Sequence, residues 1–274
     1  FIAFAIPTLL FLREKAAPPP PSAAQPNVVI VAFSRLAESI RNVGSFRDLS
    51  ILLIASLFYG TGMSVVVFFA SIIAQDFGFA GAKLVAFVAV ITVSGVVGTL
   101  IPMLFQDRFG HKKTTLGLLG VWLFTTLALA FYAWMRTRVA DPAAYPIWPM
   151  WLLGNLLGFG LGSLGSANRA FVGFLTPVSR TGEVFGLWGL VFKFSAVCTI
   201  PFGVAKDKLG TPAALLVLFA FIVIGLVITL FIDERRGRDA ARLLDGESGS
   251  DNNLAPSSGP VLRPIAAPRS PAAP

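Results

Sequence analysis

Six long apolar segments restrict the fold of this chain more than any other feature of its sequence. Each has 21 to 24 residues, and five of the six contain no Asp, Glu, Lys or Arg; the other carries Lys193. A helix needs about 20 apolar residues to cross a bilayer, whereas a strand of a membrane barrel has about 10 residues of alternating polarity. The sequence therefore predicts an all-α, polytopic membrane protein with six full transmembrane helices. They cover residues 51–74, 84–105, 114–135, 145–168, 184–205 and 212–232.

The composition indicates that lipid is the solvent for most of the chain. Charged residues make up 13% of it, against about 25% in a typical soluble domain. His111 and Cys198 are the only residues of their kinds, and the sequence has no metal-ligand cluster and no P-loop lysine motif. The sequence therefore predicts neither an enzyme nor a bound cofactor, and leaves open coupling to protons. Nucleic acid is not expected as a partner, because the basic residues lie in short loops rather than on one stripe.

The remaining residues suggest four regions. Residues 1–12 form an apolar run that is too short to span, so we expect the end of a further transmembrane helix whose beginning is missing. Residues 13–48 predict a Pro-rich linker with an amphipathic helix, and 49–234 the six-helix bundle. Residues 235–274 are rich in Gly, Ser, Pro and Ala, and we expect a disordered tail.

The distribution of Lys and Arg predicts the orientation. If each segment crosses once, and residues are counted as far as Arg242, one side of the membrane receives 14 Lys and Arg residues and the other receives five. Loops rich in Lys and Arg stay on the cytoplasmic side, so the linker and the tail are predicted to be cytoplasmic. In a bacterium the membrane would be the inner (plasma) membrane. The five residues predicted outside are Lys83, Arg136, Arg138, Lys206 and Lys208.

The short loop after the second segment carries a recognisable order of residues. It runs Asp107, Arg108, Phe109, Gly110, His111, Lys112 and Lys113. The pattern D-R-x-G-x-K-K resembles the loop signature of the major facilitator superfamily, which follows helices two and eight. By this resemblance residues 1–12 are the end of helix six and the six segments are helices seven to twelve. The chain would then be the C-terminal half of a 12-helix transporter, with a six-helix N-terminal half as its missing partner.

A second stretch resembles the vacuolar-effluxer-like branch of that superfamily, the autophagy-related amino-acid effluxers. It comprises residues 166–169, the Leu-Thr-Pro of 175–177, the Glu-Val-Phe-Gly-Leu-Trp of 183–188, and Lys193. The resemblance implies a secondary active transporter that moves a small polar solute, such as an amino acid, by alternating access. Export is favoured over uptake. Thr61 and Gly165 depart from the branch, which has Asp and Gln there. These departures support an alternative, a non-transporting membrane scaffold or receptor, or an inactive fragment of a degenerate facilitator.

Three polar residues within the segments are candidates for the substrate cavity. Lys193 lies near the middle of its segment, where an unpaired cation costs about 3 kcal/mol or more. Its ammonium either faces the cavity or is tied to backbone carbonyls or to Asn155. Asn155 and Tyr59 are the other candidates, and interhelical hydrogen bonds are at least as expected for both. Glycines with G-x-x-x-G spacing in segment 145–168 predict close helix packing.

The charged residues of the loops are candidates for a cytoplasmic gate. Asp107, Arg108 and Lys112 could form ion pairs between neighbouring helices that break when the helices move. Arg169 and Glu183 could pair across the same gate. The alternative is that the basic residues only set the topology. The gate and loop-signature candidates are Asp107, Arg108, Gly110, Lys112, Arg169 and Glu183.

Overall fold

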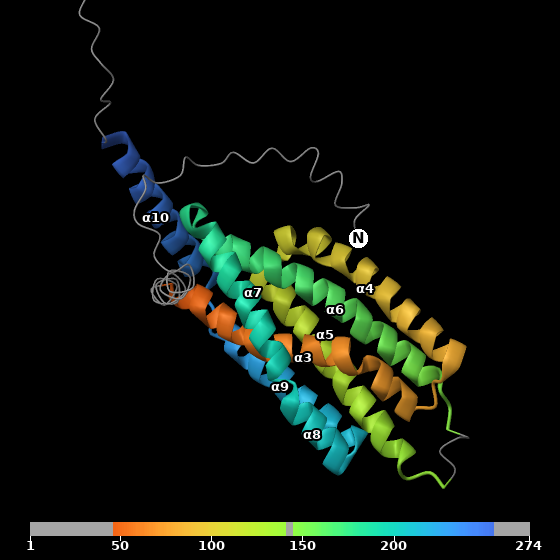
Figure 1. Cartoon of the computed structure of the whole chain (residues 1–274). Coiled ribbons are helices and arrows are strands. Elements are labelled where there is room, and N and C mark those ends of the chain that lie inside the picture. The colour runs from red at the N-terminus through yellow and green to blue at the C-terminus, as the bar shows by residue number, and fades with distance from the viewer. Residues whose placement is uncertain (1–45, 141–144, 255–274) are drawn as a thin grey trace, which may run out of the picture. The chain divides into compact units, whose positions relative to one another are not determined.

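A computed structural model of the chain describes residues 46–140 and 145–254, which all belong to one compact unit, Ser39–Pro274. Every regular element in these ranges is a helix, so the all-α prediction is confirmed for them. Figure 1 shows the helices running beside one another, with α10 at one end. They are α3 (Arg47–Asp76), α4 (Gly81–Phe109), α5 (His111–Arg136), α6 (Trp148–Leu175), the 3-10 turn η1 (Val178–Arg180), α7 (Thr181–Val197), α8 (Ile200–Leu209), α9 (Thr211–Leu230) and α10 (Glu234–Leu254).

Five stretches of these helices are long and apolar enough to cross a membrane: α3, α4, α5, the stretch Val178–Leu209 and α9. The sixth predicted span corresponds to α6, which has 28 residues and is not among these five stretches. The predicted end of a preceding transmembrane helix, 1–12, and nearly all of the linker lie outside the described residues.

Consecutive long helices run in opposite directions, so the bundle has two ends. At the α10 end, α3, α5 and α7 begin and α4, α6 and α9 end. At the other end, called the Asp76 end, α3, α5 and α8 finish and α4, α6 and α9 start. The cations in the described loops follow the same division, since Lys83, Arg136, Arg138, Lys206 and Lys208 all lie toward the Asp76 end.

Glycines let α4 and α6 pack backbone against backbone. A Cβ atom at Gly98 would lie 2.1 Å from the carbonyl oxygen of Phe159, and one at Gly162 would lie 1.8 Å from that of Gly95. No side chain fits at such distances, so these positions require glycine. The G-x-x-x-G glycines thus serve close packing, as the sequence predicts, and Figure 1 shows the two helices side by side.

The fifth predicted span is a broken helix. The chain is helical to Val197, turns at Cys198 and Thr199, and continues as α8, which has Pro201 in its first turn. Proline lacks the N–H that would continue the hydrogen bonding of the preceding helix. The two pieces pack on different neighbours, α7 on α3 and α8 on α9.

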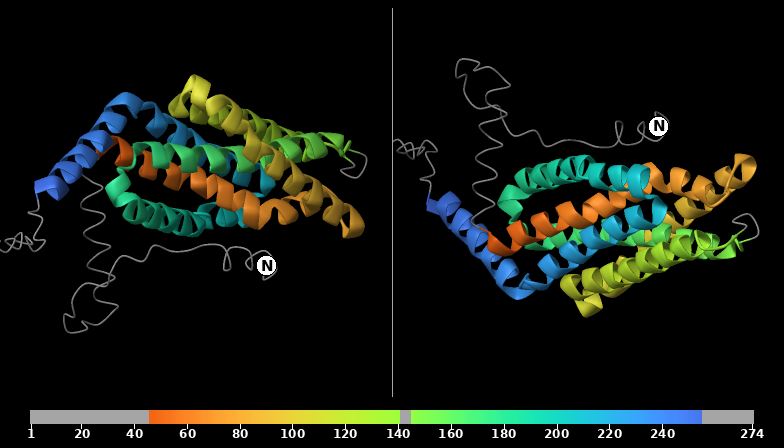
Figure 2. Two further views of the ribbon diagram at one scale, coloured as in Figure 1. Left: turned by 90° about the horizontal axis from the view of Figure 1, so that it is seen from above. Right: turned by 90° about the horizontal axis from the view of Figure 1, so that it is seen from below.

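The tail differs from its prediction. Instead of disorder from residue 235, the chain forms α10, which turns away from α9 at the end where α3 begins (Figure 2). Ala240 and Leu244 pack against a buried apolar cluster that includes Leu49, Phe171 and Ile232, and Ala241 beside them is buried. A helix can dock through one face that is made mainly of small residues, even where the composition predicts disorder. Residues 255–274 lie outside the described ranges.

Candidate functional site

The signature loop is a hairpin of one residue. Gly110 ends α4 with φ +90°, its N–H donates to the carbonyl oxygen of Gln106 at 2.9 Å, and α5 starts at the next residue. An L-residue is strained at this φ, whereas glycine is not. A Cβ here would also lie 3.1 Å from Oε2 of Glu234. Gly110 therefore sets both the turn and the close approach of α10.

Lys112 and Glu234 fasten this hairpin to the end of α9. The Glu234 carboxylate accepts the backbone N–H groups of His111 at 3.0 Å and Lys112 at 3.2 Å. The Lys112 ammonium donates to the carbonyl oxygens of Leu230 at 2.8 Å and Ile232 at 2.6 Å. A carboxylate at a helix N-terminus and a cation at a helix C-terminus are both favourable for the helix dipoles.

Asp107 and Arg108 are exposed at the end of α4. The Arg108 guanidinium lies 5.9 Å from the ring centre of Phe109, and Asp107 has no hydrogen bond or ion pair within the described residues. The predicted ion pairs among Asp107, Arg108 and Lys112 are therefore not formed in this structure.

Arg169 and Glu183 are not paired either. Arg169 places its guanidinium 5.3 Å from the ring centre of Trp188 on α7. Glu183 is exposed in the first turn of α7, where its charge is favourable for the helix dipole. The contact that links α6 to α7 here is thus a cation–π contact instead of the predicted ion pair.

A buried carboxylate at the start of α3 forms one of the two ion pairs in the described residues. Asp48 is 3% exposed and accepts two hydrogen bonds from Arg236, at 2.7 Å from Nε and 2.6 Å from the terminal nitrogen. It also accepts the backbone N–H of Asp233 at 2.8 Å. We call Asp48, Asp233 and Arg236 the Asp48 cluster. The signal in the sequence was an Asp directly before the first span and an Arg run directly after the last.

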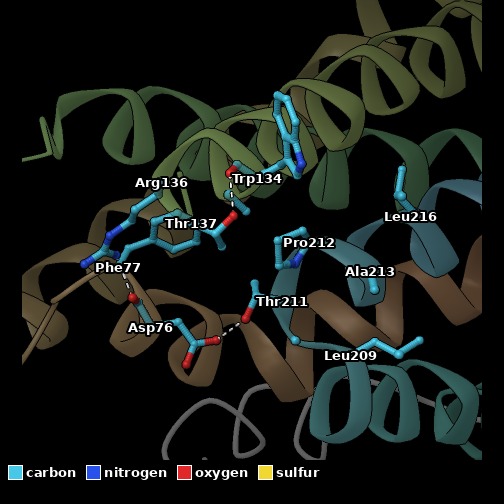
Figure 3. Close-up of a pocket in the computed structure, with 12 residues that line it drawn as sticks. Asp76, Phe77, Trp134, Arg136, Thr137, Leu209, Thr211, Pro212, Ala213 and Leu216 are labelled. Atoms are coloured by element: carbon cyan, nitrogen blue, oxygen red, sulfur yellow. Dashed lines mark hydrogen bonds between the residues drawn. The ribbon is translucent and has the colours of Figure 1, made fainter. Parts of the chain in front are cut away.

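The second ion pair lies at the opposite end of α3. Asp76 pairs with Lys206 of α8 at 2.8 Å and accepts the hydroxyl of Thr211, the first residue of α9. Arg136 donates to the Asp76 carbonyl oxygen at 2.6 Å. Figure 3 shows Asp76, Thr211 and Arg136 at the edge of an open cavity of about 600 Å³. We call Asp76, Lys206 and Thr211 the Asp76 cluster.

Tyr59 and Asn155 form interhelical hydrogen bonds. The buried Tyr59 hydroxyl donates to Oδ1 of Asn168 at 2.6 Å, and Ser56 donates to the same oxygen at 3.1 Å, which joins α3 to α6. Asn155 accepts from the hydroxyl of Ser94 and donates to the carbonyl oxygen of Trp151 at 2.8 Å, which joins α6 to α4. The structure thus favours the hydrogen-bond interpretation for both residues.

Lys193 has a different environment. It lies at the midpoint of the stretch Val178–Leu209 and is exposed, with no hydrogen bond or ion pair among the described residues. Ser195 faces α3, and a residue two positions earlier points about 200° away around a helix. Gly182, Gly186 and Gly189 lie on the outward face with Lys193, and a Cβ on any of the three would meet no atom within 4 Å.

Comparison with known proteins gives consistent matches. A family model described as "Vacuole effluxer Atg22 like" matches residues 1–242. The "Uncharacterized MFS-type transporter YxiO" of Bacillus subtilis is 23% identical over 87% of this chain and 53% of its own length. "Autophagy-related protein 22" of Coccidioides immitis is 25% identical over 91% of this chain and 44% of its own. "Choline/ethanolamine transporter flvcr2b" of Danio rerio is 31% identical over 51% and 27%. The chain thus spans about half the length of its first relatives.

Proposed function

The chain belongs to the Atg22-like vacuole effluxer family within the major facilitator superfamily of transporters, and from this premise we propose that it is the C-terminal half of a secondary active transporter. Its cargo is a small polar solute, such as an amino acid, which it exports by alternating access. In this proposal a six-helix N-terminal half completes the pathway, and the α10 end faces the cytoplasm.

The observation that carries the proposal is the position of Lys193. An ammonium at mid-membrane costs about 3 kcal/mol or more if it faces lipid, and Lys193 has no partner in the described part of this half. Its face of α7 therefore borders the missing half, not lipid. The glycines on that face leave room for a helix or a substrate to approach the backbone closely.

An unpaired cation in the pathway favours a particular kind of cargo. A carboxylate would gain a charge-assisted hydrogen bond from Lys193, whereas choline and ethanolamine carry a positive charge that the ammonium repels. The proposal therefore assigns amino acids in preference to the cargo named for the Danio rerio relative, which is similar over about half of this chain.

The test is transport by the complete protein in vesicles with an imposed pH gradient. Labelled amino acids, choline and ethanolamine are compared for wild type, Lys193→Ala and the control Val197→Ala, which shortens a 55% exposed side chain one turn further along α7. Loss of one charge-assisted hydrogen bond should reduce amino-acid flux about tenfold or more. The control should stay near the wild-type rate.

Three results would contradict parts of the proposal. Equal flux in Lys193→Ala and wild type would make Lys193 a structural residue. Flux of choline without flux of any amino acid would mean that choline, and not an amino acid, is the cargo. A folded complete protein that carries none of the solutes would favour the scaffold or receptor alternative, for which Thr61 and Gly165 are the sequence signs.

A further inference from the structure

A basic cavity of about 950 Å³ lies at the α10 end of the bundle. It is formed where α3 and α5 begin, where α6 and α9 end and where α10 starts, so that five elements meet around it. Because these are the ends of membrane-crossing helices, the cavity lies at the level where lipid head groups meet water. Seven Lys and Arg side chains and three carboxylates line it.

Several of these charged side chains already form hydrogen bonds with other groups of the protein. Lys112 is bound to two carbonyl oxygens and Arg236 to Asp48. Glu234 caps α5 and Asp233 accepts backbone N–H groups of α10. Arg238 donates from one terminal nitrogen to the carbonyl oxygen of Phe174 at 2.8 Å. Its buried Nε has no partner in the described residues.

Four cations remain without a hydrogen bond or ion pair among the described residues, and one carboxylate, Asp239, is in the same state. The four cations come from three different helices, so no single sequence segment reveals them. They are Arg47 on α3, Lys113 on α5, and Arg235 and Arg242 on α10. The cavity thus has an uncompensated positive charge, which suits an anion with several acceptor oxygens.

The structure fixes the arginines of α10 in place. Arg235 and Arg242 are seven residues apart and share one face of the helix, while Ala241, about a third of a turn away around the helix, is 3% exposed. A Cβ at Gly237 would lie 2.7 Å from Leu175, so α10 packs tightly on the end of α6. The basic face is therefore held toward the cavity before any anion binds, which lowers the entropic cost of binding.

Apolar side chains adjoin the charge on the membrane side. Leu230, the last residue of α9, and Phe231, which follows it, line the same cavity and are 51% and 67% exposed. A free inorganic anion would gain nothing from these groups. A phospholipid would place its phosphate among the cations and its acyl chains along Leu230 and Phe231. Basic pockets between membrane helices on the cytoplasmic side suit such head groups.

We propose that this cavity binds the phosphate head group of an anionic phospholipid. Arg47, Lys113, Arg235 and Arg242 contact the phosphate, and Leu230 and Phe231 contact the acyl chains. The site lies at the end of the bundle and does not include Lys193, so it stands whether or not the chain carries amino acids.

The experiment measures lipid binding by the complete protein with a spin-labelled phosphatidylglycerol in phosphatidylcholine nanodiscs. The triple variant Lys113→Ala, Arg235→Ala, Arg242→Ala removes three of the four free cations. The matched control, Lys83→Ala, Arg138→Ala, Lys208→Ala, removes the same charge at the Asp76 end. At about 1 kcal/mol per cation, the cavity variant should bind the lipid about 100-fold more weakly, while the control stays within about threefold of wild type.

A charge-preserving variant and a competition with inorganic phosphate separate the proposal from its alternatives. The charge-preserving variant Lys113→Arg, Arg235→Lys, Arg242→Lys should retain binding, which separates loss of the site from misfolding. Millimolar inorganic phosphate should not displace the lipid, because it lacks the acyl contacts. Equal weakening by both Ala variants, or full displacement by inorganic phosphate, would overturn the proposal: the first would leave only a general charge effect, the second a site for free phosphate.

Discussion

Two one-residue hairpins at opposite ends of the bundle are built from the same pattern, Asp, a basic residue, an apolar residue and Gly. One is 107–110 between α4 and α5, and the other is 207–210 between α8 and α9. Gly110 and Gly210 have φ values of +90° and +85°, and each donates its N–H to the carbonyl oxygen four residues earlier. The pattern thus makes the same turn at both ends.

The two hairpins differ in the groups that the neighbouring carboxylate binds. At the α10 end Glu234 accepts two backbone N–H groups of α5. At the Asp76 end Asp76 accepts the side-chain hydroxyl of Thr211 and pairs with the Lys206 ammonium, and its own side chain is 35% exposed. Main-chain donors cannot rotate away, whereas a lysine can exchange its partner for water. We infer that the Gly110 hairpin is the fixed end and the Gly210 hairpin the releasable one.

Substitutions in the Asp48 cluster should give the largest difference in the free energy of unfolding between the two ends of the bundle. Asp48→Ala removes three hydrogen bonds, two of them from the Arg236 guanidinium, from a buried carboxylate, and should lower the free energy of unfolding by about 2–3 kcal/mol. Asp48→Asn keeps acceptor capacity and should cost less. Denaturant unfolding of the complete protein in mild detergent measures both. A loss for Asp48→Ala no greater than for Asp76→Ala would show that the two ends are equally fixed.

The glycines offer a matched pair of substitutions. Gly110→Ala should cost about 2 kcal/mol, because alanine is strained at this φ and its Cβ also displaces Glu234. Gly210→Ala should cost about 1 kcal/mol, since the nearest atom to a Cβ there is Pro212 Cδ at 3.8 Å. Thermal unfolding of the two variants gives the comparison. Equal losses would mean that Glu234 adds nothing to the hairpin.

The contribution of Glu234 can be isolated on α10 itself. Glu234→Ala leaves two N–H groups of α5 without their acceptor and should cost about 1 kcal/mol. Asp239→Ala on the same helix is the control, because Asp239 has no hydrogen bond among the described residues, and it should leave the unfolding free energy unchanged. If Glu234→Ala and Asp239→Ala have the same free energy of unfolding, the hydrogen bonds to Glu234 do not stabilise this end of the bundle.

At the Asp76 end the stability effect should be smaller. A double-mutant cycle with Lys206→Met and Asp76→Asn should give a coupling below about 1 kcal/mol, because the pair is partly exposed and a lysine is a single point of contact. The same substitutions should alter the transport rate more strongly than the free energy of unfolding. The reason is that an ion pair that can open stabilises one of the two access states relative to the other. A coupling above about 2 kcal/mol would place this pair with the fixed contacts.

Acid should loosen α10 only slightly. The backbone N–H of Val178 donates to Asp245, and this bond, with that of Ser179, holds the pKa of Asp245 below its usual value. A lowered pKa in the folded state means that the contribution is present above the ordinary Asp pKa of about 4 and is lost as the pH falls through the folded value. The protection factors for amide hydrogen exchange at Val178 and Ser179, which correct for the pH dependence of the intrinsic rate, should therefore fall below about pH 4, and Asp245→Asn should remove that fall.

The helices were predictable because apolar length and charge spacing decide them locally. The signature loop was predictable as a tight hairpin, since Gly110 suits a left-handed turn. The partners of its charges were not predictable, because Lys112 meets carbonyl oxygens released by the end of α9 more than a hundred residues later. Likewise Arg169 contacts the ring of Trp188, five residues further along α7, and not Glu183. α10 docks through Gly237, Ala240 and Leu244, and the first two of these carry almost no hydropathy signal.

The backbone contact between α4 and α6 limits how this half can move. With carbonyl oxygens in the places where Gly98 and Gly162 would have carried side chains, neither helix can roll or slide past the other without a steric clash. α4 and α6 therefore move together as one rigid unit. Any shape change within this half must then be taken up elsewhere, and the interruption at Cys198 and Thr199 is the one described break inside a span. The lone cysteine, half-buried at that break, is also a natural attachment point for a reporter probe.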